Sequence, residues 1–181
     1  FCIEGFRFDG HQFAGEAAAR GAQAVVISKD VPLPEHVTKV YVDDTRLAMA
    51  LISKTFYGNP LLNIPLIGVT GTNGKTTVTY LVKSILEEAG KKVGLIGTIT
   101  NMIGNRKIHT ERTTPESMDL QRLFSEMKTE GVDSIVMEVS SHSLSLKRVA
   151  GCQFEVGVFT NLTQDHLDFH KSIDDYREAK A

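Results

Sequence analysis

The sequence predicts an α/β protein in which a small N-terminal α/β unit precedes a larger unit built on a mostly parallel sheet. From Leu66 onward, short apolar runs alternate with amphipathic helical stretches, as is typical of parallel sheets covered by helices. Before that point, two helical patterns surround short apolar runs. The breakers Gly58-Asn59-Pro60 and Pro65 separate the two parts. We therefore place the first unit at 1–57, a linker at 58–65 and the second unit at 66–181.

Composition and charge exclude several functional classes. The 181 residues include 20 basic and 22 acidic side chains, for a formal net charge of −2, so no nucleic-acid partner is expected. Cys2 and Cys152 lack metal-type spacing and indicate a reduced, cytoplasmic protein. No apolar run suggests membrane insertion, and we expect a monomer. Because the chain begins at Phe1 and stops within a helical pattern, we expect a piece of a longer protein.

The first unit has its own order of elements. A strand is predicted at 1–3 and a helix at 11–20, which ends before a capping glycine. Strands follow at 24–27 and 40–42. The stretch 44–57 has apolar residues at helical spacing and is predicted to be an amphipathic helix.

The second unit continues the alternation. Its predicted strands are 66–70, 93–96, 134–139 and 156–160, and a β-excursion within 99–108 turns at Gly104-Asn105. Helices are predicted at 76–89 and 115–128. For the latter we expect Thr114 as N-cap and Pro115 as the first helical residue. Ser172 and Asp175 have the spacing of a capping box for a last helix.

A glycine-rich stretch between the strand at 66–70 and the following helix predicts a phosphate-binding loop. Inward-pointing backbone amides, a Lys for the β/γ oxygens and a hydroxyl for Mg²⁺ are what such a loop needs. The stretch reads Gly71, Thr72, Asn73, Gly74, Lys75, Thr76 and Thr77. Its glycine spacing differs from the usual motif, because Val69 stands where the first glycine would be. The alternative is a glycine-rich turn with an exposed Lys.

The phosphate loop and four further motifs, in a fixed order, identify a family resemblance. The loop 70–77 resembles that of the Mur ligase superfamily, a group of ATP-dependent amide-bond ligases. The further motifs are Thr113-Thr114-Pro115-Glu116-Ser117, Glu138-Val139-Ser140-Ser141-His142, the run from Thr160 to His170, and Tyr176-Arg177-Glu178-Ala179-Lys180. Together they resemble the branch that adds the third amino acid to the peptidoglycan stem peptide. The resemblance is weaker over 1–57, where the stretch from Gly5 to Ile27 resembles the family's uridine-binding domain without its first strand.

The resemblance implies an activity, its substrates and its cofactors. A carboxylate of UDP-N-acetylmuramoyl dipeptide would attack ATP to give an acyl phosphate, and a diamino acid, meso-diaminopimelate or L-lysine, would displace phosphate. ATP and Mg²⁺ are the implied cofactors. The alternatives are a sister ligase, such as a folylpolyglutamate or cyanophycin synthetase, and a nucleotide-binding fragment without turnover. We expect the full-length protein to be an enzyme and this piece alone to be inactive.

The predicted catalytic residues are Lys75, Glu138, His166 and Lys180, and the predicted Mg²⁺ ligands are Thr76, Glu138, His166 and Lys180. Lys75 is the natural phosphate contact, and Thr76 is the natural hydroxyl for Mg²⁺. Glu138 ends a strand at the ligand edge of the sheet, where a carboxylate can hold Mg²⁺. By resemblance, His166 helps to hold a second Mg²⁺, and Lys180 reacts with CO₂ to give a carbamate ligand. Without the resemblance, Glu138 is better interpreted as a capping or ion-paired residue, and Lys180 as a solvated helical lysine.

The predicted substrate contacts also come from the resemblance. These are Thr113, Thr114, Ser140 and Arg148 for the muramyl dipeptide, and Phe6, Arg7 and Phe8 for the uracil. Leu146 and Arg112 stand where Gln and Asn can occur in the family, which affects the details of dipeptide contact. Phe6 and Phe8 are equally explained as core strand residues. His142 and His170 are interpreted as structural, and Asp165 and Asp168 as loop caps or partners of His166.

Overall fold

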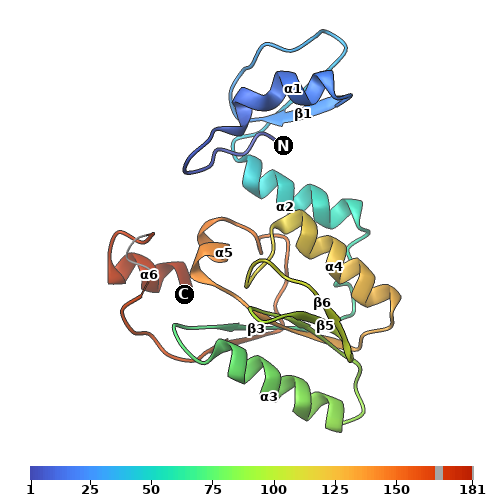
Figure 1. Cartoon of the computed structure of the whole chain (residues 1–181), viewed down its shortest axis with the longest axis vertical. Coiled ribbons are helices and arrows are strands. Elements are labelled where there is room, and N and C mark those ends of the chain that lie inside the picture. Colours follow the sequence, from blue (N-terminus) through green and yellow to red (C-terminus); the bar gives the residue numbers. More distant parts are fainter. Residues whose placement is uncertain (166–168, 181) are drawn as a thin grey trace.

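The computed structural model describes residues 1–165 and 169–180, and within this range it contains two β-sheets (Figure 1). The smaller belongs to the N-terminal unit, where β1 and β2 pair in parallel. The elements of this unit are the 3₁₀-helix η1 (Gly10–Phe13), α1 (Ala14–Ala19), β1 (Ala24–Ile27), β2 (Thr38–Tyr41) and α2 (Thr45–Phe56). Apolar residues of α1 and β1 form a small separate core.

The larger sheet has six strands in the order β6-β5-β4-β7-β3-β8. The four strands β4, β7, β3 and β8 run parallel, and β5 and β6 extend the sheet as an antiparallel hairpin. Its elements are β3 (Leu66–Thr70), α3 (Lys75–Glu88), β4 (Val93–Ile96), β5 (Asn101–Ile103), β6 (Arg106–Ile108), α4 (Ser117–Thr129), β7 (Ser134–Glu138), α5 (Ser141–Ser145), β8 (Val156–Phe159) and α6 (Ile173–Lys180). The prediction of a mostly parallel sheet is confirmed.

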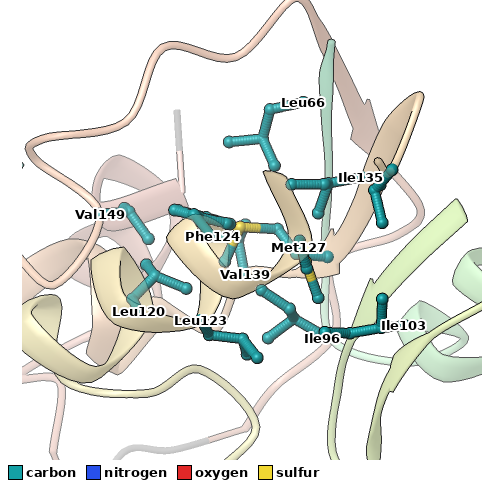
Figure 2. Packing of buried hydrophobic residues seen from close by; sticks show 12 residues of the cluster. Leu66, Ile96, Ile103, Leu120, Leu123, Phe124, Met127, Ile135, Val139 and Val149 are labelled. Atoms are coloured by element: carbon teal, nitrogen blue, oxygen red, sulfur yellow. The ribbon is translucent and has the colours of Figure 1, made fainter. Parts of the chain in front are cut away.

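Both faces of this sheet are covered, because the side chains of each strand alternate between them. In β7, Ile135 and Met137 join a core with Phe124 and other residues of α4 (Figure 2). Val136 points to the opposite face and packs with Val82 and its neighbours on α3. The strand β7 is therefore buried throughout, which fits its nearly continuous apolar run.

The helix α2 connects the two units and lies beside α4 (Figure 1). It begins at a cap made by Asp44, whose carboxylate accepts hydrogen bonds from the amides of Arg46 and Leu47, 2.9 Å each. This cap satisfies amides that have no acceptor inside the helix. Among the described residues, no helix is both long enough and apolar enough to cross a membrane.

Several local predictions need correction. The segment 1–3 is not a strand; only a single bridge between Glu4 and Asp9 forms nearby. The helix predicted from Pro115 begins at Ser117, with Glu116 in the N-cap position. Thr114 is not the cap, because its hydroxyl is held by the end of β7 instead. The short helix α5 was not predicted.

The start of the last helix agrees in part with its predicted capping box. The hydroxyl of Ser172 accepts from the amide of Asp175 at 3.1 Å. The carboxylate of Asp175 accepts from the amide of Lys171 at 3.0 Å, one residue before the position that a capping box uses. The helix nevertheless begins at Ile173, directly after Ser172.

Candidate functional site

The carboxyl ends of β3, β7, β4 and β8 lie at one edge of the sheet, as their parallel pairing requires. Four segments follow these strands and meet there. They are the loop 71–74 after β3, Gly97-Thr98 after β4, Val139-Ser140 after β7 and Thr160-Asn161 after β8. Ligands of open α/β sheets bind at such an edge, so this is the candidate site.

The phosphate loop is held on one side by the segment after β8. The amides of Thr72 and Asn73 donate to the carbonyl and the side-chain oxygen of Asn161 at 2.9 and 3.0 Å. The hydroxyl of Thr160 donates to the carbonyl of Asn73 at 2.7 Å. These bonds fix the first half of the loop. The first amides of α3, which have no acceptor within the helix, come next and form the positive end of its dipole.

Lys75 lies over this loop in the structure. Its Nζ donates to the carbonyls of Gly71 and Thr72, at 2.8 Å each. Burial lowers the pKa of Lys75, while the charges of Glu138 and Asp165 oppose the shift. The ammonium is thus held near the α3 N-terminus by carbonyls, which are weaker partners than phosphate oxygens would be. The alternative of an exposed lysine on a turn does not describe this half-buried side chain.

Glu138 is 1% exposed, and within the described part of the chain its carboxylate accepts hydrogen bonds from two threonines. Thr76 Oγ1 lies 3.0 Å from both carboxylate oxygens. Thr98 donates through its amide at 2.9 Å and through its hydroxyl at 3.1 Å. These donors supply the hydrogen bonds that a buried carboxylate needs. Gly97 makes room for it, since a Cβ there would overlap Glu138 Oε1.

Lys180 reaches the same loop from α6. Its Nζ donates to Thr70 Oγ1 and to the carbonyl of Gly71, 3.1 Å each. The residue is 7% exposed, so it is not the solvated helical lysine of the alternative interpretation. Burial lowers the pKa of Lys180 to about 8, and the neighbouring charge of Lys75 contributes in the same direction.

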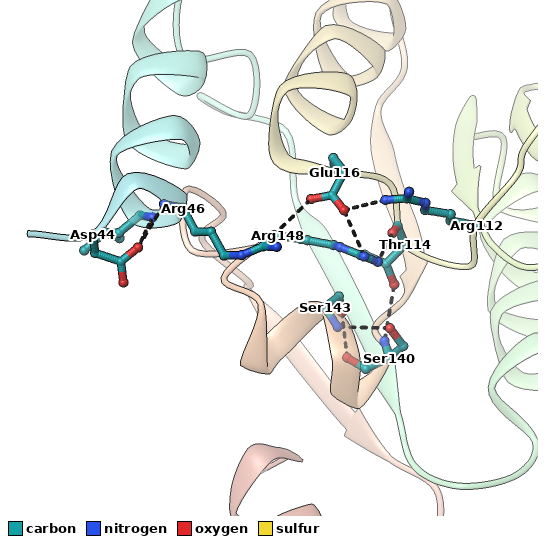
Figure 3. Close-up of polar contacts among 9 residues, drawn as sticks. Asp44, Arg46, Arg112, Thr114, Glu116, Ser140, Ser143 and Arg148 are labelled. Atoms are coloured by element: carbon teal, nitrogen blue, oxygen red, sulfur yellow. Dashed lines mark hydrogen bonds and ion pairs between the residues drawn. The ribbon is translucent and has the colours of Figure 1, made fainter. Parts of the chain in front are cut away.

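The predicted dipeptide contacts gather around Thr114 (Figure 3). Thr114 is 1% exposed; its hydroxyl donates to the carbonyl of Glu138 at 2.9 Å and accepts from the amide of Ser140 at 3.3 Å. Its single hydroxyl hydrogen is therefore already used within the protein. Thr113 lies beside it, with its hydroxyl 3.0 Å from that of Thr98. Ser140 caps α5, accepting from the amide of Ser143 at 3.2 Å.

Arg148 belongs to a cluster of three arginines around one carboxylate. Its Nη2 lies 2.9 Å from Glu116 Oε1, and its Nη1 donates to the carbonyl of Thr114 at 3.2 Å. Arg112 also donates to Glu116, and Arg46 from α2 lies 3.8 Å from its other oxygen. Burial lowers the pKa of Arg148, and the nearby arginine charges add to the effect. Three positive charges face one negative charge, which makes this region favourable for an anion.

Phe6, Arg7 and Phe8 lie on an exposed loop of the N-terminal unit. Phe6 and Phe8 are 78% and 69% exposed, so the alternative that they are core strand residues is wrong. The ring of Phe6 contacts that of Phe169 edge-on, with centroids 5.4 Å apart. Phe169 in turn packs 4.1 Å from the ring of His142. The exposed aromatic loop is thereby placed next to the segment that precedes α6.

The two histidines that we interpret as structural lie near this aromatic group. His170 is 2% exposed, and its Nδ1 lies 3.6 Å from the carboxylate of Asp175. His166 and Asp168 lie outside the described residues. Over 1–165 and 169–180, no group of three or more His, Cys, Asp and Glu side chains could hold a metal ion. The described part of the predicted magnesium set is Thr76, Glu138 and Lys180.

Several residues of the site were not among the predicted functional residues. Thr98 binds Glu138, Asn161 binds the phosphate loop, and Tyr176 contacts Thr72 across the site. Asn161 and Tyr176 stand within sequence motifs that carried the family resemblance, which is the only signal that could have found them. Glu116 is also in such a motif, but its arginine partners come from three different segments.

Comparison with known proteins gives the same assignment over the two parts of the chain. The model of the Mur ligase middle domain matches residues 69–181, and that of the Mur ligase family catalytic domain matches residues 1–57. A UDP-N-acetylmuramoyl-L-alanyl-D-glutamate–2,6-diaminopimelate ligase from Alkaliphilus metalliredigens (strain QYMF) is 59% identical over 179 residues. That match covers 99% of this chain and 36% of the relative, so the chain spans just over a third of the relative's length.

Solved structures agree. The structure of a UDP-N-acetylmuramoyl-L-alanyl-D-glutamate–2,6-diaminopimelate ligase superposes with a TM-score of 0.83 at 31% identity. The match covers 94% of this chain and 34% of that one. A MurF ligase from Thermotoga maritima in complex with ADP has a TM-score of 0.60 at 21% identity, covering 99% and 38%, and shows the common fold alone. With both parts of the chain matched by family models, this chain belongs to the Mur ligase family.

Proposed function

We propose that the full-length protein is an ATP-dependent ligase that joins 2,6-diaminopimelate to UDP-N-acetylmuramoyl-L-alanyl-D-glutamate. The observation that carries this proposal is the convergence of Lys75, the Thr76–Glu138 pair and Lys180 on one loop at the sheet edge. The two substrates are those named for the ligase of Alkaliphilus metalliredigens that is 59% identical to this chain. ATP is the third substrate, and a fold relative was solved with ADP.

The residues present fit a nucleotide phosphate and Mg²⁺. Gly74 has φ 84° and lets the loop turn into α3 without strain, so that the first helical amides face the loop. Anions bind readily at such a helix start. Thr76 and Glu138 supply a hydroxyl and a carboxylate at 3.0 Å from each other, which are oxygen donors of the kind that Mg²⁺ prefers. When bound, Mg²⁺ neutralises charge on the phosphoryl group that is transferred.

The reaction needs several anions in one place, and this chain provides the means. A substrate carboxylate attacks the γ-phosphorus, the bond to the β-phosphate oxygen breaks, and ADP leaves an acyl phosphate behind. The amine of the incoming amino acid then attacks the acyl carbon, loses a proton and expels phosphate. Lys75 would move from loop carbonyls to phosphate oxygens, a stronger charge-assisted partner, and compensate the negative charge there.

Lys180 is proposed to carry a carbamate. A neutral amine adds to CO₂ to form an N–C bond and releases one proton, which turns a cation into an anion with two oxygens. Burial supports this step, because a pKa of about 8 leaves part of the Lys180 amine neutral near pH 7. The carbamate nitrogen would keep one hydrogen for the carbonyl of Gly71, and the carbamate oxygens would accept from the hydroxyl of Thr70. With His166, these oxygens would complete the ligands of the metal site.

We propose dipeptide contacts around Thr114, carried over from the family resemblance and supported by the polar side chains that gather there. The guanidinium of Arg148 would exchange its contact with Glu116 for a substrate anion, and Thr113 and Ser140 would offer hydroxyls near the end of β7. We assign Thr114 a supporting part, because its hydroxyl is bonded to Glu138 and Ser140. The exposed Phe6, Arg7 and Phe8 would contact the uracil by stacking and hydrogen bonding.

An assay of phosphate release by the full-length protein tests this function. Release should require ATP, Mg²⁺, the UDP-muramyl dipeptide and 2,6-diaminopimelate, and L-lysine should replace the last substrate poorly. Lys75→Ala should abolish turnover, whereas Lys91→Ala, which changes an exposed lysine just after α3, should not. The 181-residue piece alone should release none. Full activity of Lys75→Ala, or release without the dipeptide, would refute the proposal.

A further inference from the structure

Tyr176 is a fully buried residue of α6, at 0% exposure, in the middle of the site described above. The other three tyrosines of the sequence, Tyr41, Tyr57 and Tyr80, are exposed or half-buried. A buried tyrosine normally has a partner for its hydroxyl. Among the described residues, a partner is found in the phosphate loop, since the Tyr176 hydroxyl lies 3.1 Å from Thr72 Oγ1.

The direction of this hydrogen bond follows from the other partners of Thr72. The Thr72 hydroxyl donates to the carbonyl of Thr163 at 3.1 Å and accepts from the amide of Thr163 at 3.0 Å. A hydroxyl has one hydrogen and two acceptor sites. Because its hydrogen is used, Thr72 can only accept from Tyr176. The tyrosine thus donates, and the hydroxyl of Thr72 uses its full bonding capacity.

The same helix meets the loop at a second point. Four residues after Tyr176, Lys180 donates to Thr70 Oγ1 and the carbonyl of Gly71. Its Nζ also lies 5.0 Å from the centre of the Tyr176 ring, within the range of a cation–π contact. One face of α6 therefore holds three consecutive residues of the loop region, 70–72, through two side chains one helical turn apart.

We propose that Tyr176 is a positioning residue that couples helix α6 to the phosphate loop, so that nucleotide affinity depends on its hydrogen bond to Thr72. The loop must keep its backbone amides in place to bind phosphate. Thr72 is next to Asn73 and Gly74, which lead into α3. Loss of the hydroxyl donor would leave an acceptor site on the buried Thr72 unfilled. The part of the loop that leads into α3 would then be held less firmly.

Coupling of this kind is reciprocal. If Tyr176 helps the loop to bind nucleotide, nucleotide must in turn stabilise the attachment of α6, the helix that carries Lys180. The inference rests on the proposed binding of ATP at this loop. It adds a residue to which neither the family resemblance nor the names of the similar proteins assign a role.

The test uses the full-length protein and the variants Tyr176→Phe and Tyr80→Phe. Tyr176→Phe keeps the buried ring and removes only the donor, and Tyr80→Phe makes the same change at a half-buried position on α3. With magnesium present, calorimetric titration should show the Kd for ATP raised about two- to tenfold in Tyr176→Phe, the range expected for one hydrogen bond. The Kd for the UDP-muramyl dipeptide should not change, and Tyr80→Phe should bind both ligands normally.

A double-mutant cycle and hydrogen exchange separate positioning from a general loss of structure. In a Thr72→Val background, Tyr176→Phe should add no further loss of ATP affinity, because its acceptor is already gone. ATP should slow amide exchange in 173–180 of the wild type and do so less in Tyr176→Phe.

Three results would overturn the inference while leaving the proposed function intact: an unchanged Kd for ATP in Tyr176→Phe, additive effects with Thr72→Val, or equal weakening of both ligands together with a lower Tm. A wild-type protein that binds no ATP would overturn both proposals.

Discussion

The carboxylate of Glu138 depends on the absence of a side chain at position 97, and Gly97→Ala therefore tests the proposed metal site. A Cβ at residue 97 would overlap Glu138 Oε1 and lie 3.3 Å from its Cδ. Gly97 has no left-handed φ, so alanine suits the backbone there. The substitution adds one methyl group against one functional side chain.

The size of the effect follows from this overlap. To restore ordinary contact, the carboxylate must move by about 1 Å, away from a position set by three donors, the Thr76 hydroxyl and the amide and hydroxyl of Thr98. Overpacking of this kind costs about 1–3 kcal/mol in stability. A misplacement of about 1 Å in a catalytic group can lower the rate about 100-fold. We expect a modest loss of Tm and a large loss of activity.

The assay is phosphate release by the full-length protein over a series of Mg²⁺ concentrations. Gly97→Ala should need about tenfold or more Mg²⁺ for half-maximal rate, since one metal-binding oxygen is displaced. Gly15→Ala is the control: it changes a helical glycine where a Cβ meets nothing within 4 Å and should be neutral or slightly stabilising. A Gly97→Ala protein with the wild-type magnesium dependence and rate would refute the assignment of Glu138 to the metal.

Three further predictions concern the same edge of the sheet. Lys180→Ala should lose most activity and regain part of it with added short carboxylates, and a wild-type level of activity in this variant would count against the carbamate. In the wild type at fixed dissolved CO₂, a ¹³C carbamate signal should rise as pH increases through about 8, because only the neutral amine reacts. Asn161→Ala removes the side-chain acceptor of the Asn73 amide and should weaken ATP binding about two- to tenfold in a titration; unaltered affinity would show that the loop holds its shape alone. Arg112→Asn leaves two arginines around Glu116 and should raise the KM for the UDP-muramyl dipeptide more at low than at high salt. An increase in KM that is the same at every salt concentration would argue against an electrostatic role for Arg112.

The order of strands and helices in the large sheet could be predicted because it depends on local pattern. The strands at Leu66–Thr70 and Val93–Ile96 have the predicted bounds, since each is a short apolar run between clear breakers. The turn at Gly104-Asn105 was found for a similar reason, as Gly104 has φ 56°. Hydrophobic period and turn residues act over a few positions, and sequence displays them directly.

The errors occurred where a residue has a distant partner. Thr114 is of a residue type that is favoured at the N-cap, but its hydroxyl donates to the carbonyl of Glu138, 24 residues away. That interaction takes Thr114 out of the helix, and the next carboxylate, Glu116, stands at the N-cap position without a capping side-chain bond. The carboxylate binds arginines instead. A local rule fails here because the site uses the residue that would otherwise cap the helix.

The candidate site was predicted as a set of residue types and not as a geometry. Lys75 and Thr76 follow from a local motif, and the end of a strand was enough to place Glu138 at the ligand edge. The burial of Lys180 could not be read from the sequence, because it requires α6 to return to a loop more than 100 residues earlier. The support from Thr98, Asn161 and Tyr176 has the same origin, since each comes from a different segment.

The unusual glycine spacing of the phosphate loop has a physical explanation in three separate requirements. Gly68 lies within β3, where a Cβ would come within 2.7 Å of the ring of Phe154, so this glycine serves packing. Gly71 has φ 134°, and a Cβ would overlap the hydroxyl of Thr160; it allows the segment after β8 to approach. Gly74 has φ 84° with open space around it, and it starts α3. Only the last two shape the phosphate loop, and the close approach at Gly71 brings Asn161 and α6 onto it. The displaced glycine is thus part of the arrangement that joins the nucleotide loop to Lys180.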